Sequence, residues 1–343
     1  MTTSNNTPPT HWKQRPEGGN RFAILLIRNI ARRGGRAIAR VCLYPIVLYF
    51  FLSRGPERRA SRTYLTRVLR KPASLFGVWR HIHTFAATIL DRVFLLGEDL
   101  RRFDVRVHGL EDLHATVDAH GGVLLFGSHL GSFEVLRVLA RERPDIPVRV
   151  VLDKAHNAAM TQLLDALNPD VAATVIDAGQ DGPSVVLEIQ HAIAEGAVVA
   201  LLVDRTQPGE PGFPVEFLGA PTQLPRAPWL IAAVLHAPVV LAFGLYRGGN
   251  RYDLMFEPFS GPIKVARKDR SQVLADMAHR YAARLEHHAR SAPYNWFNFY
   301  DFWAAPTGAP ADDKPQTRPQ DDGVARPRAA GGDVGDGSMG RAA

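Results

Sequence analysis

The chain has 343 residues, of which 46% are apolar, so it can bury one large hydrophobic core. Its one cysteine, Cys42, excludes an intramolecular disulfide, so the fold must be stable without covalent cross-links. The net charge of +7 is uneven, because residues 1–72 carry 15 Lys and Arg against 2 acids. These basic residues alternate with apolar ones and follow no groove-reading motif. We therefore expect an anionic membrane surface as a partner and no nucleic acid.

The N-terminal part predicts membrane association. Residues 1–20 form a polar N-terminus without the pattern of a cleavable signal, so we expect no export. In the basic, apolar segment 21–72, the longest uncharged run is Val41 to Ser53, whose 13 residues include Pro45. A spanning helix needs about 20 residues. We expect one or two helices lying in the membrane interface on the cytoplasmic face of an inner membrane, with a single span and a buried helix pair as alternatives.

The following residues, 73–303, predict an α/β domain. From residue 104 onward, short aliphatic runs alternate with stretches of helical periodicity, which indicates a mostly parallel central sheet covered by helices. The expected strands are 122–126, 148–152 and 197–203, and the expected helices are 111–120, 133–143, 158–166, 183–194, 227–236 and 271–290.

Two late runs, 239–246 and 252–256, read as a hairpin across 247–250 and predict an antiparallel edge. The uncharged run 227–246 is long enough for a span, but Pro238 divides it into a buried helix and a strand. Residues 304–343 contain no Leu, Ile or aromatic residue and predict a disordered tail.

The candidate catalytic residues are His129 and Glu134. The sequence from Gly121 to Glu134 predicts a buried strand, a glycine-flanked turn and a helix that Ser132 could cap. His129 then emerges at the carboxyl end of a strand, where open α/β sheets bind ligands. Residues five apart on one helix would not face each other, so His129 must precede the helix for Glu134 to reach back to its ring. Such a carboxylate would strengthen His129 as a base, although a capping or core histidine would give the same spacing.

Several motifs together resemble the lipid A biosynthesis (lauroyl/myristoyl) acyltransferase family of the lysophospholipid acyltransferase superfamily. The resemblance extends from residue 11 to about 303. It includes His11-Trp12, the His129 to Glu134 block, Leu201-Leu-Val-Asp-Arg205, Val215-Glu-Phe-Leu-Gly219, Ala237-Pro-Val-Val240 and the aromatic region around Trp296. The Phe-Pro-Glu-Gly-Thr block of the glycerol-phosphate branch is absent from the sequence. The blocks at 132–134 and 294–303 are similar to acyltransferases found with aryl polyene pathways.

The histidines show no convincing metal-ligand spacing, so we expect no metal and no other cofactor. The resemblance implies an O-acyltransferase. Its donor would be an acyl carrier protein or coenzyme A thioester, and its acceptor a hydroxyl of a lipid-like or polyene-linked molecule. His129 would be the general base and Glu134 its partner. Asp204 and Arg205 would lie near the reacting groups, with a structural ion pair as the alternative. Lys154 and Asn157 would bind substrate, or else be a surface lysine and a helix cap.

Two other functions remain open from the sequence. The same histidine could activate water in a thioesterase, and a non-catalytic lipid-binding protein would need no base at all. The segment 294–303, with seven aromatic rings in ten residues, could line an acyl groove, lie at the membrane interface, or pack on the domain as a strap.

Overall fold

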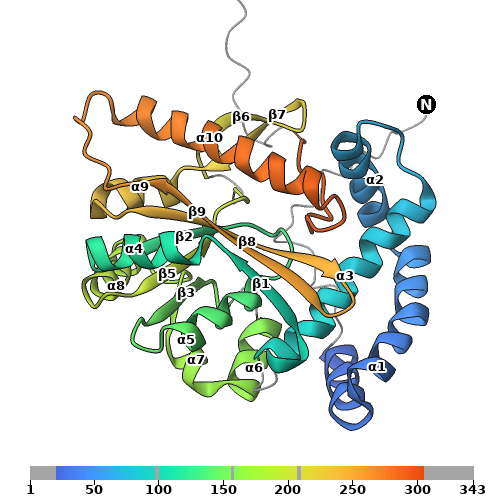
Figure 1. The fold of residues 1–343 in the computed structure, drawn as a ribbon. Helices are drawn as coiled ribbons and strands as arrows, with labels where there is room; N and C mark the ends of the chain where they lie inside the picture. Colours follow the sequence, from blue (N-terminus) through green and yellow to red (C-terminus); the bar gives the residue numbers. More distant parts are fainter. Residues whose placement is uncertain (1–20, 97–99, 156–157, 207–209, 305–343) are drawn as a thin grey trace, which may run out of the picture. The chain divides into compact units, whose positions relative to one another are not determined.

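The protein is described by a computed structural model covering residues 21–96, 100–155, 158–206 and 210–304, so the predictions for residues 1–20 and for the tail beyond Ala304 lie outside it. A seven-stranded sheet with strand order β1-β9-β8-β2-β5-β3-β4 forms its centre (Figure 1). The strands are β1 (Asp104–His108), β2 (Val123–Gly127), β3 (Val148–Leu152), β4 (Val175–Asp177), β5 (Val198–Leu202), β8 (Val239–Gly248) and β9 (Arg251–Ser260). A separate antiparallel pair consists of β6 (Gly212–Phe217) and β7 (Ala220–Pro225).

The sheet is mostly parallel. Strands β8, β2, β5, β3 and β4 share one direction, whereas β9 pairs antiparallel with β8 and β1 follows the direction of β9. The predicted fold class and the predicted hairpin across residues 247–250 are therefore confirmed. The carboxyl ends of β2, β5, β3 and β4 meet at one edge of the sheet.

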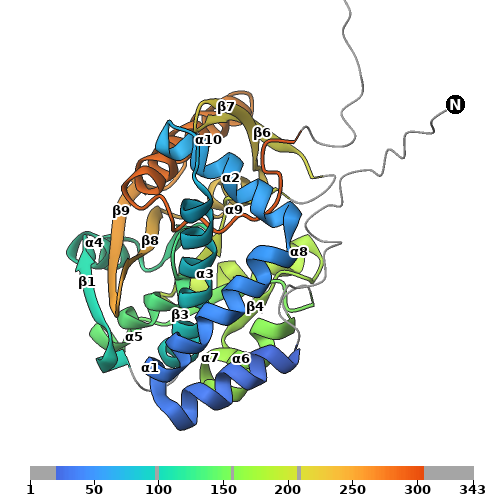
Figure 2. The ribbon, with the colours of Figure 1, turned by 90° about the vertical axis from the view of Figure 1, so that its right-hand side faces the viewer.

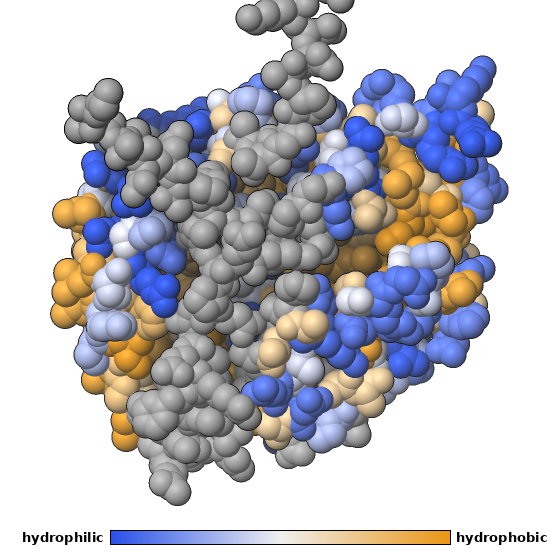
Figure 3. All heavy atoms as spheres, turned by 180° about the vertical axis from the view of Figure 1, so that it is seen from behind, coloured by the Kyte–Doolittle hydropathy of each residue, from blue (hydrophilic) through white to orange (hydrophobic). Residues whose placement is uncertain are grey.

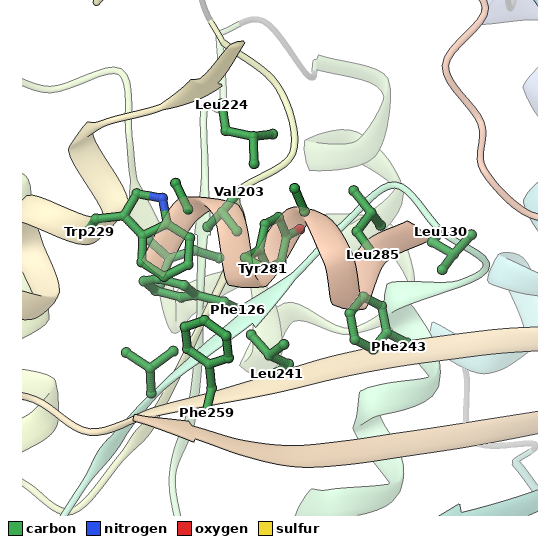
Figure 4. Packing of buried hydrophobic residues seen from close by; sticks show 14 of the residues in the cluster. Phe126, Leu130, Val203, Leu224, Trp229, Leu241, Phe243, Phe259, Tyr281 and Leu285 are labelled. Atoms are coloured by element: carbon green, nitrogen blue, oxygen red, sulfur yellow. The ribbon is translucent and has the colours of Figure 1, made fainter. Parts of the chain in front are cut away.

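Helices cover both faces of the sheet. Along β2, Leu124 and Phe126 point into one core and Val123 and Leu125 into the other, because successive side chains of a strand face opposite ways. The first core lies under α2 (Gly55–Leu69), α8 (Gly182–Ala194), α9 (Ala227–Leu235) and α10 (Arg270–Ser291). Figure 4 shows the aromatic centre of this core, where the ring of Phe126 packs edge-on against Trp229.

The opposite face is covered by α1 (Arg21–Ser53), α3 (Leu75–Leu96), α4 (Leu110–His120) and the 3₁₀ helix η3 (Phe133–Val138), which continues into α5 (Leu139–Glu142). Near β3 and β4 lie α6 (Ala158–Leu167) and α7 (Pro169–Ala173), and η2 (Leu100–Arg102) precedes β1. Helix α1 is kinked at Gly35, whose φ is 73°, and runs alongside α3 (Figure 2). Within the described residues, Gly35–Ser53 is the one helical segment long and apolar enough to cross a membrane.

Most of the elements expected from residue 104 onward are present, including the buried helix and strand on either side of Pro238. The helix expected at 133–143 differs, because its first six residues form a 3₁₀ helix and only residues 139–142 are α-helical. The sequence patterns did not single out α3, β1, β4 or the β6–β7 pair. Strand β4 has only three residues, and β1 alternates valine with polar residues and so lacks the aliphatic run that marks β2 and β5.

Candidate active site

The candidate site lies at the carboxyl edge of the two central strands β2 and β5. These strands pair in parallel with Gly127 opposite Leu202, so the residues that follow them emerge side by side. His129 follows β2, and Asp204 follows β5. The expectation that His129 precedes the helix and emerges at a strand end is therefore confirmed.

A close approach of two backbones fixes the turn that carries His129. Gly131 has a φ of 81°, and its amide donates to the carbonyl of Asn295 at 2.8 Å. A Cβ atom at Gly131 would lie 1.9 Å from the carbonyl oxygen of Gly244 in β8. The amide of Ser132 donates to that same oxygen at 2.8 Å. A side chain at residue 131 would therefore be incompatible both with the backbone conformation and with the space available.

The ring of His129 is held by Asp204. The Nδ1 atom lies 2.7 Å from Oδ1 of Asp204, and the backbone amide of His129 is 3.1 Å from each carboxylate oxygen. Asp204 is fully buried. Burial by itself raises the pKa of this carboxyl, but the charge and hydrogen bonds of His129 outweigh it and bring the pKa to about 2. An ionised carboxylate can only accept hydrogen bonds, so Nδ1 carries the hydrogen and Nε2 keeps a free lone pair.

The imidazole is neutral at pH 7. Burial lowers the pKa of His129 below its usual 6.5, and the positive charges of Arg205 and Arg92 lower it further, against the opposing effect of Asp204. The side chain nevertheless remains 29% exposed. A neutral, accessible imidazole with an acceptor nitrogen is the state that a general base requires.

A segment near the C-terminal end of the described chain completes the surroundings of Asp204. The indole Nε1 of Trp296 donates to Oδ2 of Asp204 at 3.0 Å, and the amide of Asn298 donates to the same oxygen at 3.4 Å. The amide of Phe297 donates to the carbonyl of His129 at 2.8 Å. Trp296, Phe297 and Asn298 are all buried. This part of the aromatic run thus packs on the domain as a strap.

The strap is in turn attached to α2 and α3. The carbonyl of Trp296 accepts from Nε2 of His81 at 3.0 Å, so Nδ1 of His81 accepts from the hydroxyl of Ser61 at 2.8 Å. Both His81 and Ser61 are fully buried, and burial lowers the pKa of His81 to about 4. His81 is therefore a neutral structural link between the strap and the two helices.

Glu134 has partners other than the ring of His129. The hydroxyl of Ser132 donates to Oε2 of Glu134 at 2.8 Å, and Oε1 forms an ion pair with Nε of Arg92 in α3 at 2.6 Å. The structure thus differs from the expected pairing, because Asp204 takes the position at Nδ1 that was expected for Glu134. It also differs at Ser132, whose side chain bonds to Glu134 and makes no cap hydrogen bond to the helix backbone.

Of the remaining predicted site residues, one borders the His129–Asp204 pair, one follows a neighbouring strand, and one lies outside the described residues. Arg205 borders the pair and donates to Oδ1 of Asn298 at 2.6 Å and to the carbonyl of Phe297 at 3.0 Å. Lys154 follows β3, one strand beyond β5, and its backbone amide donates to Asp177 at 3.1 Å. Asn157 lies outside the described residues.

Sequence reasoning did not identify Trp296, Asn298 or Arg92 as parts of the site. The two asparagines within the aromatic run were the available signal for the strap, because a polar amide among buried rings needs a buried partner. Arg92 gave no signal, since α3 itself was not predicted.

The chain is an α/β protein whose mostly parallel sheet carries a histidine–carboxylate pair at its carboxyl edge, where open α/β sheets bind ligands. A family model described as bacterial lipid A biosynthesis acyltransferase matches residues 85–304, and the chain belongs to that family. The expected family is thus confirmed. No curated protein matches the chain. Membership makes the protein an acyltransferase with an acyl donor and a lipid acceptor, in a family that is typically membrane-associated.

Proposed function

We propose that the protein transfers an acyl chain from a carrier thioester to a hydroxyl group, with His129 as general base and Asp204 as the carboxylate that orients it. The bond of 2.7 Å between Nδ1 of His129 and Oδ1 of Asp204 carries this proposal, because it leaves Nε2 unprotonated on a partly exposed ring.

In the proposed reaction, Nε2 of His129 takes the proton of the acceptor hydroxyl while its oxygen attacks the thioester carbonyl. The tetrahedral oxyanion then collapses, the carbon–sulfur bond breaks, and the thiolate receives the proton from the imidazolium. The new ester contains the acyl group and the acceptor oxygen, so neither a covalent enzyme intermediate nor a cofactor is needed. Asp204 stabilises the transient imidazolium, as a carboxylate does in a hydrolase triad.

Glu134 has a second, indirect role in this proposal. Its carboxylate fixes the guanidinium of Arg92, which is near enough to His129 to lower the pKa of its ring. A guanidinium held there would stabilise the negative charge that develops on the thioester oxygen. Glu134 would then position Arg92 and would not itself take a proton from the acceptor.

The donor in this proposal is an acyl carrier protein or coenzyme A thioester, and the acceptor is a lipid-like or polyene-linked hydroxyl. Arg205 and, one strand further along the same edge, Lys154 would bind anionic groups of these substrates. The N-terminal part of the chain is basic, so its charge is complementary to anionic lipid headgroups. We propose that the protein binds the cytoplasmic face of an inner membrane.

A comparison of His129→Ala with His191→Ala tests the proposed base. His191 lies exposed on α8, so its replacement controls for the loss of a histidine elsewhere. Purified variants receive an acyl thioester with and without a lipid hydroxyl acceptor, and mass spectrometry follows the ester and the free acid. We expect His129→Ala to lose at least a hundredfold in ester formation and the control to retain it. Wild-type transfer by His129→Ala would refute the base, and full turnover without acceptor would favour a thioesterase.

A further inference from the structure

Helix α1 carries an apolar stripe that the protein itself does not cover. Val41, Tyr44, Leu48 and Leu52 recur at spacings of three and four residues, which places them along one side of the helix. Their exposed fractions lie between 51% and 68%. The opposite side, with Ala39, Leu43 and Val47, is almost completely buried.

The stripe continues onto the start of α3. The ring of Tyr44 stacks on Trp79 at 5.9 Å between centroids, and Trp79 stacks on Phe76 at 6.0 Å. Phe76 is 70% exposed, and its neighbour Leu75 is similarly exposed. In Figure 3, apolar residues line the left edge of the view, the side on which α1 lies in that orientation. Two helices therefore share one continuous apolar surface with aromatic rings.

This surface is set in a strongly basic part of the chain. Residues 35–96 contain eleven Lys and Arg against two acids, Glu57 and Asp91. Asp91 is fully buried against Arg36, and Glu57 forms an ion pair with Arg54, so neither acid offsets the remaining basic residues. The charge is complementary to anionic lipid headgroups and would oppose the approach of a second copy of the same surface.

The N-terminal end of the stripe is fixed to the domain body. Asp91 accepts from Nε and Nη2 of Arg36 at 2.7 and 2.8 Å, and from the hydroxyl of Tyr252 at 3.0 Å. Arg40 donates to the hydroxyl of Tyr246 and to the carbonyl of Gly249. A helix that crossed a bilayer would have to leave the body, which would expose its buried side to lipid and leave Asp91 without its charge partner.

We propose that the outer side of α1 and the start of α3 form a docking surface for an anionic lipid bilayer, and that Gly35–Ser53 lies along this bilayer without crossing it. Tyr44 and Trp79 are amphipathic rings suited to headgroup depth. The site and the first turns of α1 would then be on the same side of the membrane. This topology does not depend on the proposed chemistry of His129.

Vesicle binding by the full-length protein tests the surface. The variant Val41→Glu/Leu48→Glu removes two exposed apolar side chains from the stripe. The matched control Val234→Glu/Leu187→Glu changes the same residue types, 55% and 54% exposed, on α9 and α8. With vesicles of phosphatidylcholine and phosphatidylglycerol, we expect the first variant to lose at least tenfold in partitioning and the control less than twofold. We also expect the wild-type protein to bind vesicles of phosphatidylcholine alone more weakly than vesicles that contain phosphatidylglycerol.

Equal binding by both variants would overturn the docking surface. Sedimentation without lipid measures whether the protein is a dimer. If the wild type were a dimer and the stripe variant a monomer, the surface would be a contact between two copies, and this result would also overturn the proposal. Neither result depends on acyl transfer, so failure here is distinguishable from failure of the proposed function.

Depth measurements test the orientation of the helix. Cys42 is the one cysteine of the chain, so Cys42→Ser provides a background for single cysteines at positions 41, 48 and 52. Each is labelled with an environment-sensitive fluorophore and quenched by spin-labelled lipids of known depth. A helix along the bilayer places all three labels at one shallow depth. A spanning helix would separate positions 41 and 52 by about 16 Å along the bilayer normal, and that result would overturn the proposal.

Discussion

Replacement of Asp204 by asparagine distinguishes the two carboxylates proposed to act with His129. In the wild-type protein, Trp296 and Asn298 donate to Oδ2 of Asp204, whereas His129 donates to Oδ1. An asparagine would therefore place its carbonyl oxygen at the position of Oδ2, where it can accept from both donors. Its NH₂ group would then replace Oδ1 and face the imidazole. The Nδ1 atom must then accept a hydrogen bond, which moves the ring hydrogen to Nε2 and removes the base.

We expect Asp204→Asn to lower kcat by about 10³ to 10⁴, equivalent to roughly 4 to 5 kcal/mol, as tautomer reversal does in a hydrolase triad. Glu134→Gln should cost less, about ten- to a hundredfold, because it loosens Arg92 and leaves the ring of His129 in place. Steady-state ester formation measures both, and circular dichroism verifies that the variants are folded. If Asp204→Asn kept more than a tenth of the activity while Glu134→Gln lost nearly all of it, the assignment of Asp204 would be refuted.

The same substitution has a stability effect that depends on pH. The pKa of Asp204 is about 2 in the folded protein against an ordinary 3.8, because His129 outweighs the effect of burial. The ionised form therefore contributes about 2 kcal/mol to the free energy of unfolding above pH 4, and this contribution is lost as the pH falls from 4 toward 2. Denaturant unfolding should show a gap between the wild type and Asp204→Asn that narrows in acid. A gap that widens in acid would contradict this sign.

Three further predictions concern the surroundings of the pair. The acid limb of the activity profile should have its midpoint below pH 6.5, because burial and nearby arginines lower the pKa of His129; a midpoint above 7 would contradict this. Trp296→Phe should lower kcat about three- to tenfold and move the acid limb of the activity profile to higher pH, because one donor to the buried carboxylate of Asp204 is lost. In the control Trp303→Phe, the lost indole donates to a backbone carbonyl, so the acid limb should not move. Gly131→Ala should lower the free energy of unfolding by more than 3 kcal/mol in denaturant titrations, and Gly219→Ala, with a φ of 75° and open space around it, by about 1 kcal/mol; equal losses would argue against the close approach.

The sequence allowed the scaffold of the site to be predicted, because its signals are local. The apolar runs before His129 and Asp204 indicated two buried parallel strands, and such strands place the residues that follow them at one edge of the sheet. The glycine at position 131 indicated the turn. These features depend on periodicity and backbone conformation, which neighbouring residues largely determine.

The hydrogen-bond partners within the site could not be predicted in the same way. Spacing favoured Glu134 as the partner of His129 because it is five residues away, whereas Asp204 is 75 residues distant. The choice between them depends on strand order and on the 3₁₀ geometry of η3, and neither has a local signal. Trp296 reaches Asp204 across 92 residues. Contacts of this kind follow from the tertiary fold alone.

The strap that contains Trp296 has a consequence for the time at which the protein can first become active. In the turn at His129 and Gly131, the amide of Gly131 donates to the carbonyl of Asn295 and the carbonyl of His129 accepts from the amide of Phe297. This turn therefore lacks two of its partners until nearly the whole described region has been synthesised. A nascent chain that already carries α1 and the complete β2–β5 pair would still have an unfinished site. The enzyme would therefore remain inactive while it is still attached to the ribosome, at a stage when α1 can already bind lipid.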